Sequence, residues 1–204
     1  EGAYCRVTGA PCDGALVCSS TPGDGGRCVP VAAVGEVCDP LRVMVRCAND
    51  SRCRLDATRG GVCTDEVARQ PEPDDTPGDR ALHVTAGVVV DATLPDGDVD
   101  CFAVDVPEGG RVVALVTDAS GRCPASTGYA FSLDLIDRDG VTPRGTAERN
   151  GPLGNTCSLL DGVIHAWARG LAAGTYYVCA RGDGHTSPTD RYPRVSLTLA
   201  AFPR

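Results

Sequence analysis

The chain contains no lysine, so all 19 of its basic residues are arginine. Arginine together with abundant alanine, glycine and valine indicates a GC-rich genome, and we expect a bacterial source. The net charge is −8, divided as about 0 in residues 1–63, −4 in residues 64–80 and −4 in residues 81–204. An acidic chain without a basic patch is poorly suited to the phosphate backbone of nucleic acids. We therefore expect no nucleic-acid partner.

The chain also lacks an apolar run of the roughly 20 residues that a membrane-spanning helix needs. It contains no CxxC pair, because its closest cysteines are six residues apart. None of the three histidines, His83, His165 and His185, stands near a pair of cysteines. This spacing excludes the usual zinc sites. The chain begins at Glu1 without methionine or an apolar leader, and we expect a mature chain whose signal peptide has been removed.

Catalytic motifs are missing as well. No GxSxG segment occurs, and the histidines lie in unrelated contexts, so a nucleophile, a base and an orienting carboxylate cannot be assembled from the sequence. His165 lies in the alternating segment 163–167 and is expected in a strand, where it packs across strands. We expect no enzymatic activity.

Twelve cysteines are the most informative feature that is present. Their number is even and high for a reducing compartment, so we predict disulfides and an extracellular or cell-surface location. The twelve are Cys5, Cys12, Cys18, Cys28, Cys38, Cys47, Cys53, Cys63, Cys101, Cys123, Cys157 and Cys179.

Residues 1–63 contain an internal repeat, which predicts one cysteine-rich module of two units, 1–30 and 31–63. Four cysteines of the first unit are separated by 7, 6 and 10 positions, and those of the second by 9, 6 and 10. Units of this size cannot bury a sufficient core, and two bridges in each unit would supply the missing stability.

The second unit reads Gly35-Glu36-Val37-Cys38, followed by Cys47, Cys53 and Cys63. This pattern resembles the small cysteine-rich repeats of the colipase/dickkopf/prokineticin type. In such repeats the first cysteine pairs with the third, and the second with the fourth. The resemblance therefore implies the pairs Cys5–Cys18, Cys12–Cys28, Cys38–Cys53 and Cys47–Cys63.

Residues 64–80 are rich in proline and acidic side chains and hold few apolar ones. We predict an extended linker there, because such a segment cannot bury enough surface to fold alone.

Residues 81–204 contain short runs of valine, leucine, threonine and aromatic residues between glycine, proline and aspartate. Phe102, Val104 and Val106 alternate on one face of their run, and Leu197 and Leu199 do the same. We predict strands at 83–94, 101–106, 111–118, 129–137, 159–168, 174–181 and 194–202. The fold class is therefore mainly β: a small disulfide-rich module followed by a β-sandwich or jelly roll.

Four segments of this part match the bacterial pre-peptidase C-terminal family in their order along the chain. They are DGDVDCFAVDVPEGG (96–110), FSLDLIDRDG (131–140), LAAGTYYVCARG (171–182) and RVSLTLA (194–200). Residues 85–200 thus resemble this family of small β-sandwiches appended to secreted proteases. Phe102 stands where the family usually has tyrosine. The resemblance implies a structural calcium ion in some relatives.

Side-chain direction gives a guide to the four later cysteines. Cys101 and Cys179 lie on the outward faces of their predicted strands, whereas Cys123 and Cys157 lie in loops. Among the three pairings this favours Cys101–Cys179 with Cys123–Cys157.

The acidic triplet Asp96, Asp98 and Asp100 is a candidate site for structural calcium, because alternate carboxylates at a strand entry supply hard oxygen ligands. The alternative is an Asp-Gly-Asp turn that binds nothing. Asp134, Asp137 and Asp139 form a second acidic group. No cofactor is required by any motif.

Three other features have simple interpretations. Arg181-Gly182-Asp183 spells an integrin-recognition tripeptide in a predicted loop, where a plain turn is the favoured interpretation. Trp167 is expected to pack in the core or at its rim rather than stack on a sugar. Leu41, Val43, Met44 and Val45 form an apolar run in a module too small to bury it, and they are a candidate interface.

Three non-catalytic interpretations remain, two of them functions and the third an origin from a larger protein. The first is a structural subunit that self-associates into a surface filament or sheath, since head-to-tail contacts make open polymers. The second is a secreted adhesion module for a protein or polysaccharide. The third is an accessory fragment of a secreted hydrolase. We favour the filament subunit at this level.

Overall fold

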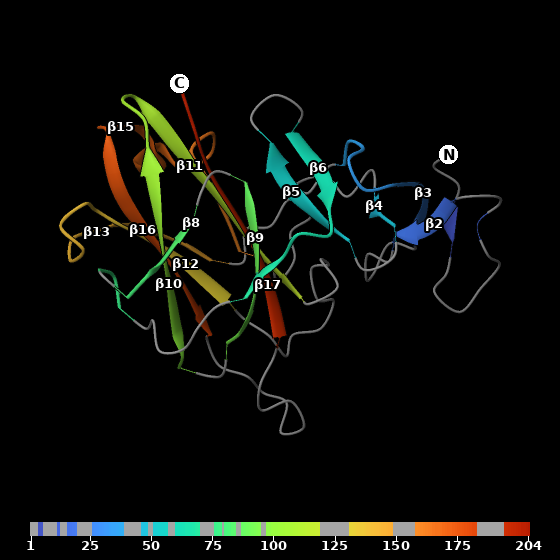
Figure 1. Cartoon of the computed structure of the whole chain (residues 1–204), viewed down its shortest axis with the longest axis horizontal. Coiled ribbons are helices and arrows are strands. Elements are labelled where there is room, and N and C mark those ends of the chain that lie inside the picture. The colour runs from blue at the N-terminus through green and yellow to red at the C-terminus, as the bar shows by residue number, and fades with distance from the viewer. Residues whose placement is uncertain are drawn as a thin grey trace. The chain divides into compact units, whose positions relative to one another are not determined.

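The computed structural model divides into two compact units, Glu1–Glu66 and Val67–Arg204 (Figure 1). Strands make up most of the described part of each unit, as the sequence predicts. The structure describes residues 4–5, 12, 16–19, 26–38, 46–48, 51–56, 60–69, 76–78, 80–84, 87–94, 97–118, 131–148, 158–182 and 194–204.

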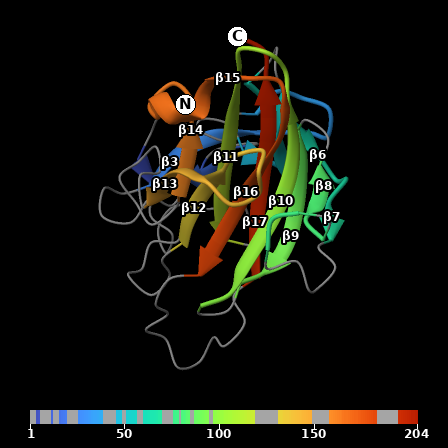
Figure 2. The ribbon, with the colours of Figure 1, turned by 90° about the vertical axis from the view of Figure 1, so that its left-hand side faces the viewer.

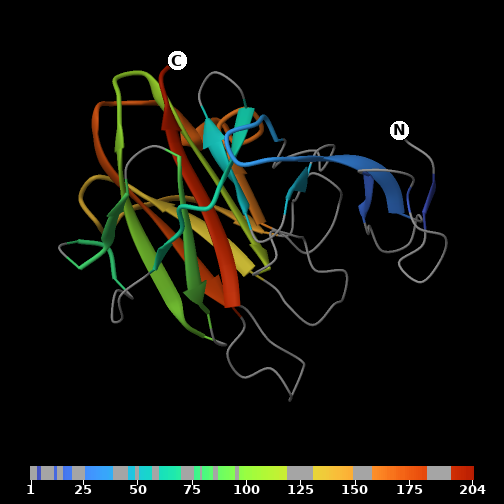
Figure 3. The same ribbon diagram turned by 45° about the vertical axis from the view of Figure 1, so that its right-hand side comes forward.

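The N-terminal unit is built from two small sheets, the first of which is drawn in blue near the N-terminus in Figure 3. In the first sheet β3 lies between β1 and β2, and β4 also pairs with β3. The second sheet is the hairpin β5–β6. The strands are β1 (Tyr4–Cys5), β2 (Leu16–Ser19), β3 (Gly26–Ala32), β4 (Arg46–Cys47), β5 (Arg52–Asp56) and β6 (Gly60–Thr64).

Both predicted repeats contain the same hairpin. Cys18 stands opposite Cys28 in β2–β3, and Cys53 stands opposite Cys63 in β5–β6. The third and fourth cysteines of each repeat are therefore neighbours across two strands. The repeated spacing in the sequence thus corresponds to a repeated structural element.

Three disulfides are described in this unit: Cys12–Cys28, Cys38–Cys53 and Cys47–Cys63. They agree with the pairing that the cysteine-rich repeats imply. The expected pair Cys5–Cys18 lies outside the described side chains.

The Gly35–Cys38 segment forms a tight turn against the last strand of its repeat. Gly35 has φ +87°, a conformation that side chains disfavour. The Gly35 amide donates to the Cys63 carbonyl at 2.8 Å, and the Cys63 amide donates to the Glu36 carbonyl at 2.9 Å. The glycine of this motif is therefore required by the backbone.

The C-terminal unit consists of a five-stranded and a six-stranded sheet that enclose one core (Figure 2). The five-stranded sheet has the order β13-β12-β16-β10-β8. The six-stranded sheet has the order β14-β11-β17-β9-β7, and β15 also pairs with β11. The strands are β7 (Ala68–Arg69), β8 (Leu82–Val84), β9 (Val88–Thr93), β10 (Val99–Val106), β11 (Gly110–Asp118), β12 (Phe131–Ile136), β13 (Pro143–Glu148), β14 (Ser158–Asp161), β15 (Arg169–Leu171), β16 (Gly174–Gly182) and β17 (Arg194–Phe202).

The alternating side chains fill the space between the two sheets. Phe102, Val104 and Val106 of β10 enter the core together with Leu197 and Leu199 of β17. This confirms the predicted period of two and the predicted mainly-β sandwich. Strands such as β10 and β17 are long and regular because every second side chain is apolar and is buried in this core.

A fourth disulfide lies on the other side of the five-stranded sheet. Cys101 of β10 stands directly opposite Cys179 of β16, and the two are bonded. Ala81 and Ala103 pack around this bridge, which is buried. The bond agrees with the side-chain directions expected from the sequence, while Cys123 and Cys157 lie outside the described residues.

Two predicted strands were wrong in extent. Residues 83–94 form β8 and β9, which belong to different sheets, and Gly87 between them has φ +80°. Residues 159–168 form β14 only as far as Asp161, after which the chain turns into a short 3-10 helix, Ala166–Ala168. His165 therefore stands at the N-cap position of this helix, without a capping hydrogen bond from its side chain, instead of lying in a strand.

The predicted linker 64–80 also differs from the structure. Ala68 and Arg69 form β7, which pairs in parallel with Val90 and Asp91 of β9. Ala68 packs against the sandwich core. An edge strand can order a polar segment because it offers unpaired backbone groups.

Trp167 is partly buried and packs against the core, which agrees with its expected place at the rim. Its ring lies over Gly145 of β13. A β-carbon on Gly145 would lie only 2.5 Å from Cε2 of Trp167. We therefore expect Gly145→Ala to displace the indole and to lower the free energy of unfolding by about 1–3 kcal/mol. Because Trp167 is the only tryptophan in the chain, its emission should move to longer wavelength.

The control for this substitution is Thr146→Ser, which keeps the hydroxyl that donates to Asp134 at 2.6 Å. Its emission should match that of the wild type. Unchanged emission in Gly145→Ala would contradict the close packing of the indole on β13.

Candidate ligand-binding cleft

An arginine-lined cleft of about 730 Å³ is formed by residues of β11, β15, the segment after β14 and the C-terminus. Figures 1 and 2 show β15 and the C-terminus at the same end of the sandwich. Pockets of this size accommodate small molecules or short segments of larger ones. The lining residues are Gly109, Arg111, Gly162, Val163, Ala166, Arg169, Gly170 and Arg204.

Strand β11 brings these residues together because three other strands pair with it. Arg111 stands opposite Phe202 of β17 on one side and opposite Arg169 of β15 on the other. The amide of Gly162 donates to the carbonyl of Val112, which holds the turn after β14 at the same end. The cleft is thus a direct consequence of strand register.

Arg111 is held in place by two neighbours. Its Nη1 lies 3.2 Å from Oδ1 of Asp161, a carboxylate that also accepts from the Val163 amide at 3.0 Å. The Arg111 guanidinium lies over the Phe202 ring, 5.2 Å from its centre. Contacts of this kind fix the guanidinium before a ligand arrives.

Arg111 and Arg169 form a like-charge pair directly across two strands. Such pairs are destabilising, and of the two arginines Arg111 has an ion-pair partner among the described carboxylates, Asp161. Arg169 and Arg204 form no ion pair with any described carboxylate. A local conflict of this type is typical of a functional site, where an anion would relieve it.

Glycines keep the cleft open. A β-carbon on Gly162 would lie 2.9 Å from Cβ of Arg111 and 3.1 Å from Cβ of Arg169. Gly109 and Gly170 have φ +68° and +63°, respectively. Gly162 therefore allows the turn after β14 to pack closely on the two arginines, and the positive φ angles favour glycine at the other two positions.

Sequence reasoning missed this cleft, and the expectation of a chain without a basic cluster was wrong. The three arginines are far apart along the chain: Arg111 lies in β11, Arg169 lies in β15, and Arg204 follows β17. Neighbouring glycines are a weak signal, since Gly is abundant throughout. Only the register of β11 shows that the arginines meet.

The predicted calcium triplet is partly described. Asp96 lies outside the described residues. The carbonyl of Asp98 accepts from the Gly182 amide at 3.1 Å, and Gly97 turns the chain with φ +79°. Asp100 is only 1 % exposed. The turn interpretation accounts for the first half of the segment, and the calcium site stays a prediction.

The second acidic group has protein donors as partners. Asp134 accepts from Thr146 and, at 3.0 Å, from Arg181. Asp137 lies 2.8 Å from Nη1 of Arg144. The Arg138 amide and then Arg144 lower the pKa of Asp137. These two carboxylates stabilise strand contacts.

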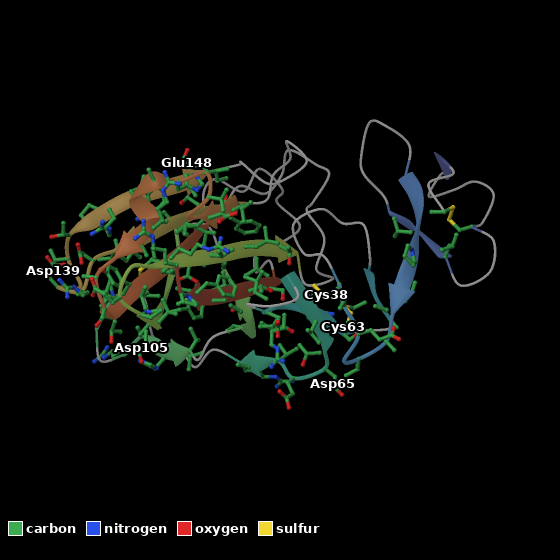
Figure 4. The ribbon with its side chains drawn as sticks, turned by 90° about the horizontal axis from the view of Figure 1, so that it is seen from above. Cys38, Cys63, Asp65, Asp105, Asp139 and Glu148 are labelled. Carbon is green, nitrogen blue, oxygen red and sulfur yellow. A yellow bond between two sulfur atoms is a disulfide. The ribbon has the colours of Figure 1, made fainter. Side chains whose placement is uncertain are left out.

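Asp139 organises the turn between β12 and β13, where Figure 4 labels it. The Thr142 hydroxyl, the Thr142 amide and the Val141 amide donate to it and lower its pKa from 3.8 to about 2. A lowered pKa stabilises the fold above the unfolded value, and that stability is lost as pH falls from about 4 to about 2. The turn is therefore a pH-sensitive element.

We expect Asp139→Ala to show this loss directly. Urea midpoints of wild type and variant should differ most near neutral pH and should converge between about pH 4 and about pH 2. A difference that stays constant down to pH 2 would show that these hydrogen bonds do not favour the ionised carboxylate. Thr142→Val, which removes one donor, should give an intermediate profile.

The other predicted site residues fall into two groups. Arg181 and Gly182 lie in β16, so the expected loop for the tripeptide was wrong at these positions, and Asp183 lies outside the described residues. His83 lies 3.3 Å from Asp105 on the sheet surface (Figure 4 labels Asp105). The candidate interface Leu41, Val43, Met44 and Val45 and the histidine His185 lie outside the described residues.

One cluster of metal-ligating residue types occurs among the described side chains, in the N-terminal unit. Figure 4 labels two of its members, Cys38 and Cys63. It consists of Cys38, Cys47 and Cys63, whose sulfur atoms lie within 4.8 Å of one another. All three sulfurs are already in disulfides. No thiolate is left there to bind a metal.

Comparisons with solved structures find, among others, two proteins that resemble this chain with low sequence identity and low TM-scores. The pre-peptidase C-terminal domain of a collagenase from Bacillus anthracis is 12 % identical, with a TM-score of 0.41 over 63 % of this chain and 98 % of that one. The g-type lysozyme inhibitor PliG from Aeromonas hydrophila is 8 % identical, with a TM-score of 0.36 over 68 % and 99 %. The first is a domain of the kind that residues 85–200 resemble. No family model and no curated protein match the chain.

Neither similarity assigns a family, because both TM-scores are low. The sandwich is established by its own strand pairing. No helix in the described ranges has the length and hydropathy for crossing a bilayer. The four described disulfides are typical of proteins from oxidising compartments.

Proposed function

We propose that the chain is a secreted, non-catalytic binding module whose site is the arginine cleft. The observation that carries this proposal is that Arg111, Arg169 and Arg204 line one cleft in a chain of net charge −8. Three cationic side chains with one carboxylate partner among the described residues, Asp161 beside Arg111, favour an anionic ligand. Three arginines in one cleft of an acidic chain do not make the extended basic surface that nucleic acids need, so we still expect no nucleic-acid partner.

The chemistry of the described side chains supports binding over catalysis. The cysteines with described side chains are consumed in disulfides. Asp134 and Asp137 pair with arginines, and His83 contacts an exposed carboxylate. These groups have partners within the fold, whereas Arg169 and Arg204 of the cleft have no ion-pair partner among the described carboxylates.

A binding assay tests the proposal. Calorimetry at low ionic strength should detect a short galacturonate oligomer, a sulfated oligosaccharide or a carboxylated peptide as a saturable ligand. Arg169→Glu with Arg204→Glu should weaken binding about 100-fold or more, because two charge-assisted contacts become repulsive. Arg80→Glu, an exposed reversal outside the cleft, is the matched control and should bind as the wild type does. Failure of all three anions to bind would contradict the proposal.

A filament subunit is the second candidate. Val34 and Val37 of the N-terminal unit are 56 % and 51 % exposed, and they precede the apolar run 41–45. Exposed apolar side chains that lie close in the chain favour a protein contact. Sedimentation over a wide concentration range and negative-stain images test this candidate, and a monomer at every concentration would contradict it. The accessory-fragment origin is tested by mass spectrometry of the native chain.

A further inference from the structure

The turn that reaches the arginine cleft carries two exposed aliphatic side chains, Val163 in the lining and Ile164 next to it in the chain. Val163 and Ile164 are 66 % and 59 % exposed, and Val163 lines the cleft. Asp161 holds their turn, because its carbonyl accepts from the amides of Ile164 and His165 at 3.1 and 2.8 Å. The two aliphatic side chains are therefore presented on a fixed turn beside positive charge.

An open strand edge borders the same cleft. Among the described strands, β15 (Arg169–Leu171) pairs only with β11. Its other edge therefore has no strand partner in the described part of the chain. Gly170 is exposed, and a β-carbon there would meet nothing within 4 Å. The backbone of β15 is accessible to an extended ligand.

We propose that the cleft receives the carboxyl-terminal end of a peptide whose last residue is aliphatic. This inference rests on the proposed binding function and adds its ligand class. The terminal carboxylate pairs with Arg111, Arg169 and Arg204, and the last side chain packs on Val163 and Ile164. The peptide backbone adds to the free edge of β15, as in other proteins that capture peptide ends.

The lining favours a peptide end over other anions. Sugars are commonly bound on exposed aromatic faces, but the lining contains no aromatic residue, and Phe202 lies beneath Arg111. Single-stranded nucleic acids likewise need stacking platforms. A carboxylate beside an aliphatic group and a backbone edge matches the three features that the cleft offers.

The test uses the full chain and three synthetic peptides. The first is Gly-Ser-Gly-Ser-Thr-Val with a free carboxylate, the second is its C-terminal amide, and the third ends in glycine. Calorimetry should show that amidation weakens binding about 10-fold or more, since it removes the charge that the arginines contact. Replacement of the last valine by glycine should weaken binding about 5-fold or more.

Variants divide the site into its charged and apolar parts. Val163→Ser with Ile164→Ser should lower the affinity for the valine-ended peptide to that for the glycine-ended one, and should leave the latter unchanged. Arg169→Glu should weaken binding of both free acids. Arg80→Glu should alter neither.

The outcomes separate this inference from the proposed function. Equal binding of the free acid and the amide overturns the inference. So does binding of the galacturonate or sulfated oligosaccharide in the cleft without any peptide binding, while the proposed function then stands. Absence of binding by all of these anions overturns both.

Discussion

Removal of the Cys101–Cys179 bridge is expected to destabilise the C-terminal unit by about 4 kcal/mol. The bridge joins residues 78 positions apart, and a longer closed loop restricts the unfolded chain more strongly. Cys101→Ala with Cys179→Ala avoids a free thiol and keeps small side chains in the buried cluster with Ala81 and Ala103. The melting temperature should fall by roughly 10–20 °C.

Trp167 fluorescence reports the unfolding of the C-terminal unit, because the only tryptophan of the chain belongs to that unit. The control is Cys47→Ala with Cys63→Ala, which removes a bridge of the N-terminal unit. Its tryptophan transition should stay at the wild-type temperature, since the chain forms two compact units. An unshifted transition in the Cys101/Cys179 variant would contradict the stabilising role of the bridge.

Phe102→Ala is expected to cost about 3–5 kcal/mol of unfolding free energy. Phe102 is 0 % exposed and stands opposite Val178 on one side and Leu82 on the other. Its removal leaves a cavity in the core between the two sheets. Urea unfolding followed by Trp167 emission gives the value.

Phe102→Leu is the graded control, because it keeps most of the apolar volume. Its cost should be about 1 kcal/mol. A loss below about 1 kcal/mol in Phe102→Ala would show that the ring does not fill the core.

The strands that could be predicted are those whose inward positions hold large apolar side chains. Phe102, Val104 and Val106 in β10 and Leu197 and Leu199 in β17 alternate clearly, and the core contains them all. The alternation fixes both the strand and its inward face, because a shift by one residue would expose every apolar side chain.

The elements that were not predicted from the sequence lack an alternating pattern of large apolar side chains. β13 (Pro143–Glu148) places Gly145 and Ala147 inward, and the volume above Gly145 is supplied by Trp167 from another segment. β7 contributes two residues to a sheet edge and has no alternation at all. The turn after Asp161 depends on that carboxylate accepting from the Val163 amide. The contacts of β13 and β7 join distant segments and have no local pattern, whereas the turn at Asp161-Gly162 has a local one, since aspartate and glycine favour turns.

The described disulfides could be predicted from the sequence, whereas the candidate site could not. Cysteine spacing together with a resemblance gave the pairs that the structure describes in the N-terminal unit. The cleft arises because β11 pairs with β14, β15 and β17, and pairing of distant strands cannot be deduced from composition. The net charge of −8 therefore gives no indication that three arginines line one cleft.

The central claim is that the arginine cleft is the binding site of this module. A nitrogen-15 NMR titration of the full chain, first with the galacturonate oligomer and then with the valine-ended peptide, tests it most directly. We predict that at least one ligand shifts the amide signals of Gly109, Arg111, Gly162 and Gly170, which line the cleft. Shifts confined to other surfaces, or no shifts with either ligand, would contradict the claim.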